Sequence, residues 1–152
     1  MRKEVKSVIG ISRCLVGDNC TYRGDSNLIE ELKSLKEEAI LVCPEVLGGL
    51  PIPRDPAEIV SESPLKVMTV KGEDVTKEYV EGAKKALDYL LENNVDTVIV
   101  KSNSPSCGAG IIYDGTYSHK KIKGDGVFVR LLRQNNIQVY TAEDYLAKKK
   151  GD

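Results

Sequence analysis

Histidine and aromatic residues are scarce in this chain of 152 residues. It contains one His, one Phe and no Trp, against four Cys. A metal site built from two or three histidines is therefore excluded, and so is a nucleophilic triad that uses any histidine other than His119. His119 itself lies among Ser118, Lys120 and Lys121, which is typical of an exposed loop. The cysteines are thus the more informative residues.

The sequence also lacks a long apolar run and a strong net charge. No run approaches the roughly 20 residues of a membrane span. The charged residues 1–6 are not followed by a signal-type apolar stretch. A formal net charge of −1 removes the basic field that non-specific DNA binding needs. We therefore expect a soluble, cytoplasmic protein with no DNA or membrane partner, and its length predicts one domain over residues 1–152.

Short β-branched runs alternate with amphipathic segments along the chain. Strands are predicted at Val8–Ser12, Ala39–Val42, Thr97–Val100 and Ile137–Tyr140, with a peripheral strand at Leu65–Val70. Helices are predicted at Asn27–Lys36, Thr76–Asn93 and Val127–Gln134, and Thr141 caps a short terminal helix. This alternation predicts an α/β fold with a mostly parallel sheet and helices on both faces.

Three local signals add detail to this pattern. Thr76 is a candidate N-cap for the second helix. Asp114-Gly115 predicts a tight type I′ hairpin turn within Ile111–Tyr117. The proline-rich segment Glu45–Pro64 predicts a long irregular loop, which in a compact domain is usually functional.

The cysteines are not spaced as in a local metal-binding loop. Residues Cys14, Cys20, Cys43 and Cys107 are separated by 5, 22 and 63 residues, so the zinc-ribbon and ferredoxin spacings are absent. Cys14, Cys43 and Cys107, however, each follow a predicted parallel strand, and the carboxyl ends of parallel strands meet at one edge of a sheet. Three thiolates there suit a thiophilic centre, either zinc or a 4Fe–4S cluster with one open iron. The role of Cys20 stays open.

Side chains that could do chemistry flank these cysteines. Glu45, in Cys-Pro-Glu, is a candidate general acid/base. Ser104 and Ser106 precede Cys107 and could hold its thiolate or orient a substrate. The backbone N–H groups at Gly108 and Gly110 could approach a sulfur or an oxyanion.

Two further segments carry weaker signals. Arg54 could pair with Asp55 or bind a substrate carbonyl or phosphate. Gly124–Gly126 is either an anion-binding nest or a simple helix start.

Five long segments of the chain resemble a bacterial family first catalogued as a domain of unknown function, whose characterised members are thiouracil desulfurases of the TudS type. These segments are Ile11–Asn27, Cys43–Val60, Gly72–Leu87, Ser102–Tyr117 and Gly124–Tyr140. The resemblance implies a single Rossmann-like domain with an oxygen-sensitive 4Fe–4S cluster on three cysteines. It also implies desulfuration of a thiolated base such as 2-thiouracil, whose sulfur binds the fourth iron and leaves as sulfide without redox turnover.

The resemblance assigns roles to individual residues. It implies Cys14, Cys43 and Cys107 as cluster ligands, Glu45 as the catalytic acid/base and an assisting serine, for which we favour Ser104 over Ser102 and Ser106. We expect Ser106, Gly108 and Arg54 to contact the substrate, which is a small molecule.

Two alternatives remain open from the residues alone. One is a binding or structural protein whose cysteines hold zinc. The other is a metal-free enzyme in which Cys107 is the nucleophile beside a glycine-rich oxyanion loop. The oligomeric state and the identity of the thiolated base are not predicted, and a cluster on three cysteines could be lost from protein prepared in air.

Overall fold

A four-stranded parallel sheet forms the centre of the protein. The computed structural model describes residues 8–17, 28–52, 54–101 and 106–150. The sheet has the order β2 (Ile40–Val42), β1 (Val8–Ser12), β5 (Val95–Val100) and β8 (Gln138–Thr141). All neighbouring strands run parallel, and Ile11 of β1 lies between Leu41 and Ile99 in register. The predicted α/β fold with a mostly parallel sheet is confirmed.

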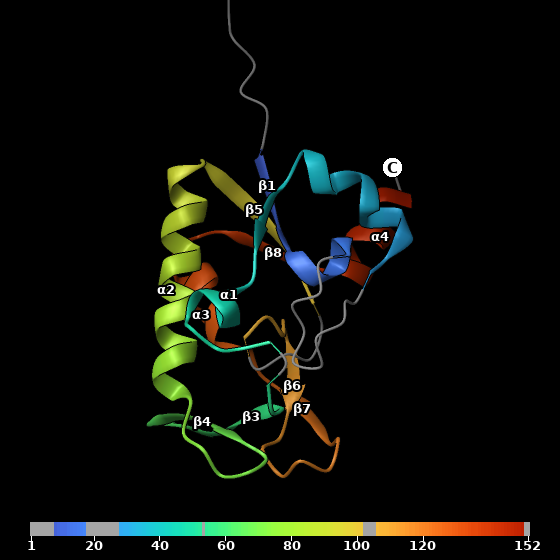
Figure 1. Cartoon of the computed structure of the whole chain (residues 1–152). Helices are drawn as coiled ribbons and strands as arrows, with labels where there is room; N and C mark the ends of the chain where they lie inside the picture. Colours follow the sequence, from blue (N-terminus) through green and yellow to red (C-terminus); the bar gives the residue numbers. More distant parts are fainter. Residues whose placement is uncertain (1–7, 18–27, 53, 102–105, 151–152) are drawn as a thin grey trace, which may run out of the picture.

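Helices cover both faces of this sheet (Figure 1). On one face lie α2 (Thr76–Glu92) and α3 (Val127–Gln134), whose Leu90 and Phe128 share a core with Val98 of β5. On the other face lie the 3-10 helices η1 (Arg13–Val16) and η2 (Glu30–Glu37) and the helix α4 (Ala142–Lys150), which pack around Ile11 and Ile99. Val98 and Ile99 face opposite ways because side chains alternate along a strand, which is why the sheet is apolar on both faces.

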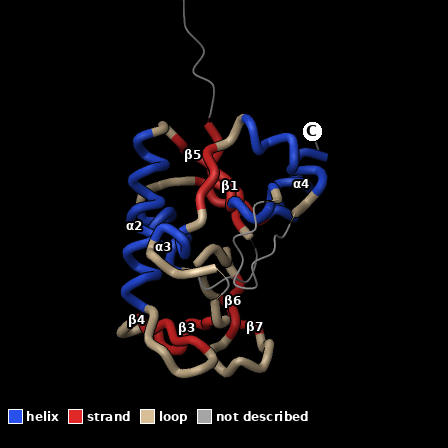
Figure 2. Tube along the Cα trace, in the orientation of Figure 1, coloured by secondary structure: helices blue, strands red, loops and turns tan. Residues whose placement is uncertain are grey.

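Two small antiparallel sheets lie beyond the end of the main sheet at which β1 terminates (Figure 2). One pairs β3 (Ala57–Glu62) with β4 (Leu65–Thr69), and the other pairs β6 (Ile111–Tyr113) with β7 (Lys121–Lys123). No helix in the described part of the chain is long and apolar enough to cross a bilayer.

Several sequence predictions are wrong in detail. The segment Glu45–Pro64 is not irregular, because it contains most of α1 (Pro44–Leu47) and all of β3. The segment Asn27–Lys36 is not an α-helix where it is described; a 3-10 helix occupies Glu30–Glu37 instead. Short elements like these are set by the packing of neighbouring elements, which local periodicity does not report.

Thr76 is the first residue of α2 and not its N-cap, which is Val75. Its hydroxyl accepts a hydrogen bond from the N–H of Val67 in β4 at 2.8 Å and donates one to Asp74 at 2.6 Å. The hydroxyl therefore ties the start of α2 to β4 and does not cap the helix.

The predicted tight turn at Asp114-Gly115 is also wrong. Tyr113 pairs with Lys121, so the connection is the longer loop 114–120. The buried carboxylate of Glu58 in β3 accepts hydrogen bonds from the N–H groups of Gly115 and Tyr117, at 3.0 and 3.1 Å. A tertiary contact thus shapes this loop and overrides the local turn preference.

Candidate active site at the carboxyl edge of the sheet

The three cysteines singled out by the sequence lie near the ends of three neighbouring strands. Cys14 lies in η1 directly after β1, and Cys43 links β2 to α1. Cys107 follows β5 after the segment 101–106. The exposed fractions of the three residues are 7, 8 and 5% respectively, and all three are buried thiols. They lie around the position where the strand order reverses between β1 and β5, the place where α/β sheets bind ligands.

Electrostatics links the three thiols to one another and to Glu45. Burial raises the pKa of Cys107 well above its ordinary value, and the negative charges of Glu45, Cys43 and Cys14 raise it further. A hydrogen bond with the hydroxyl of Ser12 acts in the opposite direction. A site that gathers so many potential negative charges in a buried place is one that a positively charged centre would stabilise.

The arrangement of the described side chains bears on the kind of metal centre that the thiols could hold. Among the described residues, no three His, Cys, Asp or Glu side chains are close enough together to hold one metal ion. In a 4Fe–4S cluster each cysteine binds a different iron, so its ligands do not converge on one point. Three soft, buried thiols are donors that suit a 4Fe–4S cluster, whose ligands need not converge on one ion.

Ser12 is a site residue that the sequence analysis missed. Its side chain is 3% exposed at the end of β1, and its hydroxyl accepts the N–H of Lys101 at 3.3 Å as well as contacting Cys107. It thereby joins the carboxyl ends of β1 and β5. A polar residue at the last position of a buried strand was the available signal.

Glu45 and Arg54 form an ion pair next to the cysteines. Glu45 lies in the first turn of α1, and its Oε2 is 2.6 Å from Nη2 of Arg54. The side chains are 16% and 7% exposed, and Arg54 also donates to the carbonyl of Pro51 at 3.2 Å. The expected alternative pair of Arg54 with Asp55 is not formed, because Asp55 pairs with Lys71 at 3.3 Å instead.

Two glycines bring α1 into position against α2. A Cβ atom on Gly82 would overlap the carbonyl of Pro44, and one on Gly48 would overlap the carbonyl of Glu78. The backbones of the two helices are therefore in direct contact. Because Cys43 and Glu45 border or belong to α1, this crossing sets where both side chains lie.

Tyr79 is the second residue that sequence analysis missed, because its place in an apolar helix stripe predicts a plain core residue. It is 4% exposed, and burial raises its pKa well above the ordinary value. The nearby negative charges of Glu45, Cys107 and Cys43 raise the pKa further, whereas Arg54 lowers it. The hydroxyl of Tyr79 therefore lies within electrostatic reach of the candidate site.

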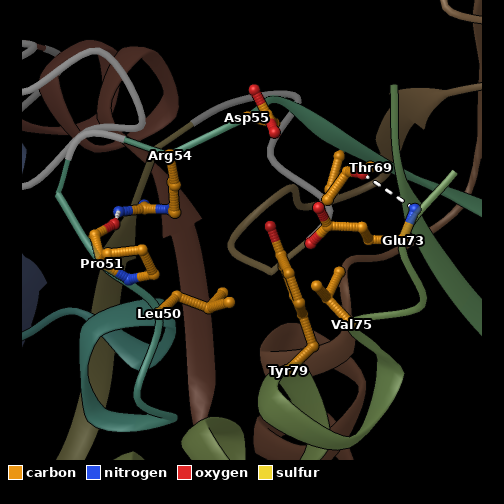
Figure 3. A pocket seen from close by; sticks show the side chains of 9 residues that line it. Leu50, Pro51, Arg54, Asp55, Thr69, Glu73, Val75 and Tyr79 are labelled. Atoms are coloured by element: carbon orange, nitrogen blue, oxygen red, sulfur yellow. Dashed lines mark hydrogen bonds between the residues drawn. The ribbon is translucent and has the colours of Figure 1, made fainter. Parts of the chain in front are cut away.

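A cavity of about 380 Å³ lies next to Arg54 and Tyr79 (Figure 3). Arg54 and Tyr79 both line it. The other lining residues are Leu50, Pro51, Asp55, Ala57, Thr69, Glu73 and Val75. Its mixture of apolar walls and a few polar groups is typical of a small-molecule site.

The loop that carries Cys107 is held by the start of α3. The carbonyl of Ser106 accepts the N–H of Phe128 at 3.0 Å, and the carbonyl of Gly108 accepts that of Gly126 at 2.8 Å. Asp125 accepts the N–H of Gly110 at 2.7 Å. The segment Gly124–Gly126 thus binds this loop, which favours a structural role over an anion nest.

The remaining predicted residues are placed as follows. Ser106 is fully buried beside Cys107. His119 is exposed and makes an edge contact with the ring of Tyr113 at 5.9 Å between centroids. Cys20, Ser102 and Ser104 lie outside the described residues.

Comparison with known proteins identifies similar chains over most of the length. The family model described as 2-thiouracil desulfurase matches residues 9–144. YbbK of Bacillus subtilis (strain 168), a protein described as uncharacterized, is 44% identical over 146 residues, which span 90% of this chain and 97% of that protein. A solved structure described as a [4Fe-4S]-dependent thiouracil desulfidase, TudS, is 39% identical and superposes with a TM-score of 0.84 over 95% of this chain and 99% of that one.

Proposed function

The chain belongs to the 2-thiouracil desulfurase family, and from that premise we propose that it removes sulfur from a thiolated pyrimidine such as 2-thiouracil with the help of a 4Fe–4S cluster. The observation that carries the proposal is the set of three buried thiols at the strand ends, in a chain that resembles a cluster-dependent desulfidase over 95% of its length. The reaction exchanges a carbon–sulfur bond for a carbon–oxygen bond. Water supplies the oxygen and the protons, sulfur leaves as hydrosulfide, and no electrons are transferred.

Cys14, Cys43 and Cys107 are the proposed cluster ligands. Their burial and their mutual electrostatic influence support this assignment. When bound, the cluster supplies an iron without a cysteine ligand, which attracts the substrate sulfur and polarises its bond to carbon. None of the three described cysteines forms a disulfide, which is usual in a reducing compartment and supports a cytoplasmic location.

Glu45 is the proposed acid/base. Arg54 holds Oε2, whereas Oε1 has no hydrogen-bond partner in the described part of the chain. Oε1 can therefore take a proton from the attacking water and pass it on. We further propose that Ser104 assists, that Arg54 contributes to substrate binding from the cavity wall, and that Ser106 and Gly108 shape the substrate site through the Cys107 loop.

The metal-free alternative has less support. A nucleophilic cysteine needs a lowered pKa and a nearby base. Burial raises the pKa of Cys107, and the negative charges of Glu45, Cys43 and Cys14 raise it further, so the nucleophilic thiolate is disfavoured there.

The test is iron and sulfide quantitation on protein purified without oxygen, followed by sulfide release from 2-thiouracil. We expect about four irons per chain and a broad absorbance near ~400 nm, both lost in Cys43→Ala. Cys20→Ala is the matched control and should keep its iron. A Cys43→Ala protein that retains iron and activity, or a wild-type protein that carries one zinc instead, would contradict the proposal.

A further inference from the structure

Tyr79 is a buried residue whose hydroxyl faces a cavity. The residue is 4% exposed on α2, and its hydroxyl makes no hydrogen bond to any residue that the structure describes. Figure 3 shows the side chain rising from the helix with the hydroxyl directed into the cavity. A hydroxyl that a buried side chain presents only to a cavity is available to hydrogen-bond a ligand there.

The cavity suits a flat heterocycle with a few polar atoms. Leu50, Pro51 and Val75 are apolar residues of the cavity wall, and Thr69 and Glu73 add polar atoms to it. Its volume of about 380 Å³ lies at the small end of the about 300–1,000 Å³ of typical ligand sites. A six-membered ring can lie against the apolar walls while its edge reaches the Tyr79 hydroxyl.

Two residues of the cavity wall interact with groups of the candidate active site. Arg54 lines the cavity and binds Glu45 at 2.6 Å. Tyr79 lines the cavity and is influenced by the charges of Glu45, Cys107 and Cys43. None of the described thiols lines the cavity, and Arg54 and Tyr79 are the lining residues that connect it to them.

We propose that the hydroxyl of Tyr79 donates a hydrogen bond to the carbonyl oxygen that the thiolated base retains, and so fixes the orientation of the base with its sulfur toward the cysteines. This assignment rests on the proposed desulfurase function. Because burial keeps the hydroxyl protonated at neutral pH, Tyr79 is available as a donor. A site built around such a donor discriminates against an analogue that lacks the oxygen.

The test pairs a side-chain change with a ligand change. 2-Thiouracil has a ring carbonyl oxygen that pyrimidine-2-thione lacks. Both are dialysed to equilibrium against cluster-loaded protein that carries Glu45→Gln to suppress turnover, with and without Tyr79→Phe. Tyr89→Phe is the matched control, because Tyr89 lies on the same helix and is 45% exposed.

We expect Tyr79→Phe to weaken the binding of 2-thiouracil about 10-fold and that of pyrimidine-2-thione less than about 2-fold, with no change for Tyr89→Phe. An equal loss for both ligands, or none for either, overturns the role of Tyr79. The desulfurase function is judged separately, by sulfide release from 2-thiouracil in the wild-type protein. Turnover with equal losses therefore refutes the role of Tyr79 alone, and absence of turnover refutes the function on which it rests.

Discussion

The ion pair between Arg54 and Glu45 determines which carboxylate oxygen can move a proton. Nη2 of Arg54 occupies Oε2, and the guanidinium is itself held by the carbonyl of Pro51. With the carboxylate oriented from one side, Oε1 is the oxygen left to act on water. An arginine held at two points restricts the carboxylate to one orientation, and such positioning lowers a barrier without any change in the chemistry.

Glu45→Gln tests this role at the level of one atom. The amide keeps the size of the side chain but cannot accept the proton, so we expect kcat to fall about 10²–10⁴-fold. Iron content should stay at the wild-type value, because Glu45 is not a proposed ligand. The control is Glu81→Gln, an exposed carboxylate on α2. If Glu45→Gln retains kcat within about 2-fold, Glu45 is not the acid/base.

Among elements, the crossing of α1 and α2 has the most direct consequence for the site. α1 has four residues and could not persist alone, because an isolated turn of helix is unstable. It persists here because Pro44 starts it and because the glycines at the crossing let its backbone rest on α2. Glu45 and Cys43 thus depend on a glycine in a different helix for their positions.

Gly82→Ala tests that dependence. Alanine in place of glycine inside a helix usually stabilises it by about 1 kcal/mol. At Gly82 the new Cβ would instead overlap the carbonyl of Pro44, so we expect a loss of about 1–3 kcal/mol in the free energy of unfolding.

The measurement is urea unfolding together with iron content. Displacement of α1 should also lower the fraction of protein that holds a cluster. Glu81→Ala, at the adjacent exposed position, is the control and should leave both quantities unchanged. A Gly82→Ala protein more stable than the wild type would show that the helices do not need this close contact.

Element prediction succeeded where local pattern and burial agree, and failed where tertiary contacts decide. The strand at Val8–Ser12 was predicted with its observed bounds, because its short β-branched apolar run is a local signal. The loop 114–120 was not, because Glu58 from another sheet accepts its N–H groups. The same holds for α1, whose stability depends on Gly82, far away in the sequence.

At the scale of the molecule, the sequence predicts that the cysteines lie near strand ends. The groups around them, however, come from several strands and helices. Tyr79 was missed because it looks like an ordinary core residue of a helix, and Ser12 because one polar residue at a strand end does not show what it contacts. Only the fold brings the hydroxyl of Tyr79, on α2, within electrostatic reach of Cys43, next to α1. A site assembled from separate strands and helices leaves no local spacing for sequence analysis to detect.

The burial of Tyr79 also makes the free energy of unfolding depend on pH in the alkaline range. Its folded-state pKa lies above the unfolded value of about 10, chiefly because burial disfavours the phenolate. The folded state therefore retains the proton longer than the unfolded state. The stability tied to that proton is complete below the unfolded pKa and is lost as pH rises toward and through the folded value.

We expect the free energy of unfolding to fall as pH rises above about 10, and to fall less steeply in Tyr79→Phe than in the exposed control Tyr89→Phe. Burial also raises the pKa of Cys107, so its ionisation would add to the pH dependence. The wild type, Tyr79→Phe and Tyr89→Phe are therefore compared at equal cluster content. Urea unfolding across this range measures the slopes. Equal slopes in the two variants would mean that Tyr79 ionises as easily in the folded state as in the unfolded one, and that its hydroxyl is not in the buried setting described above.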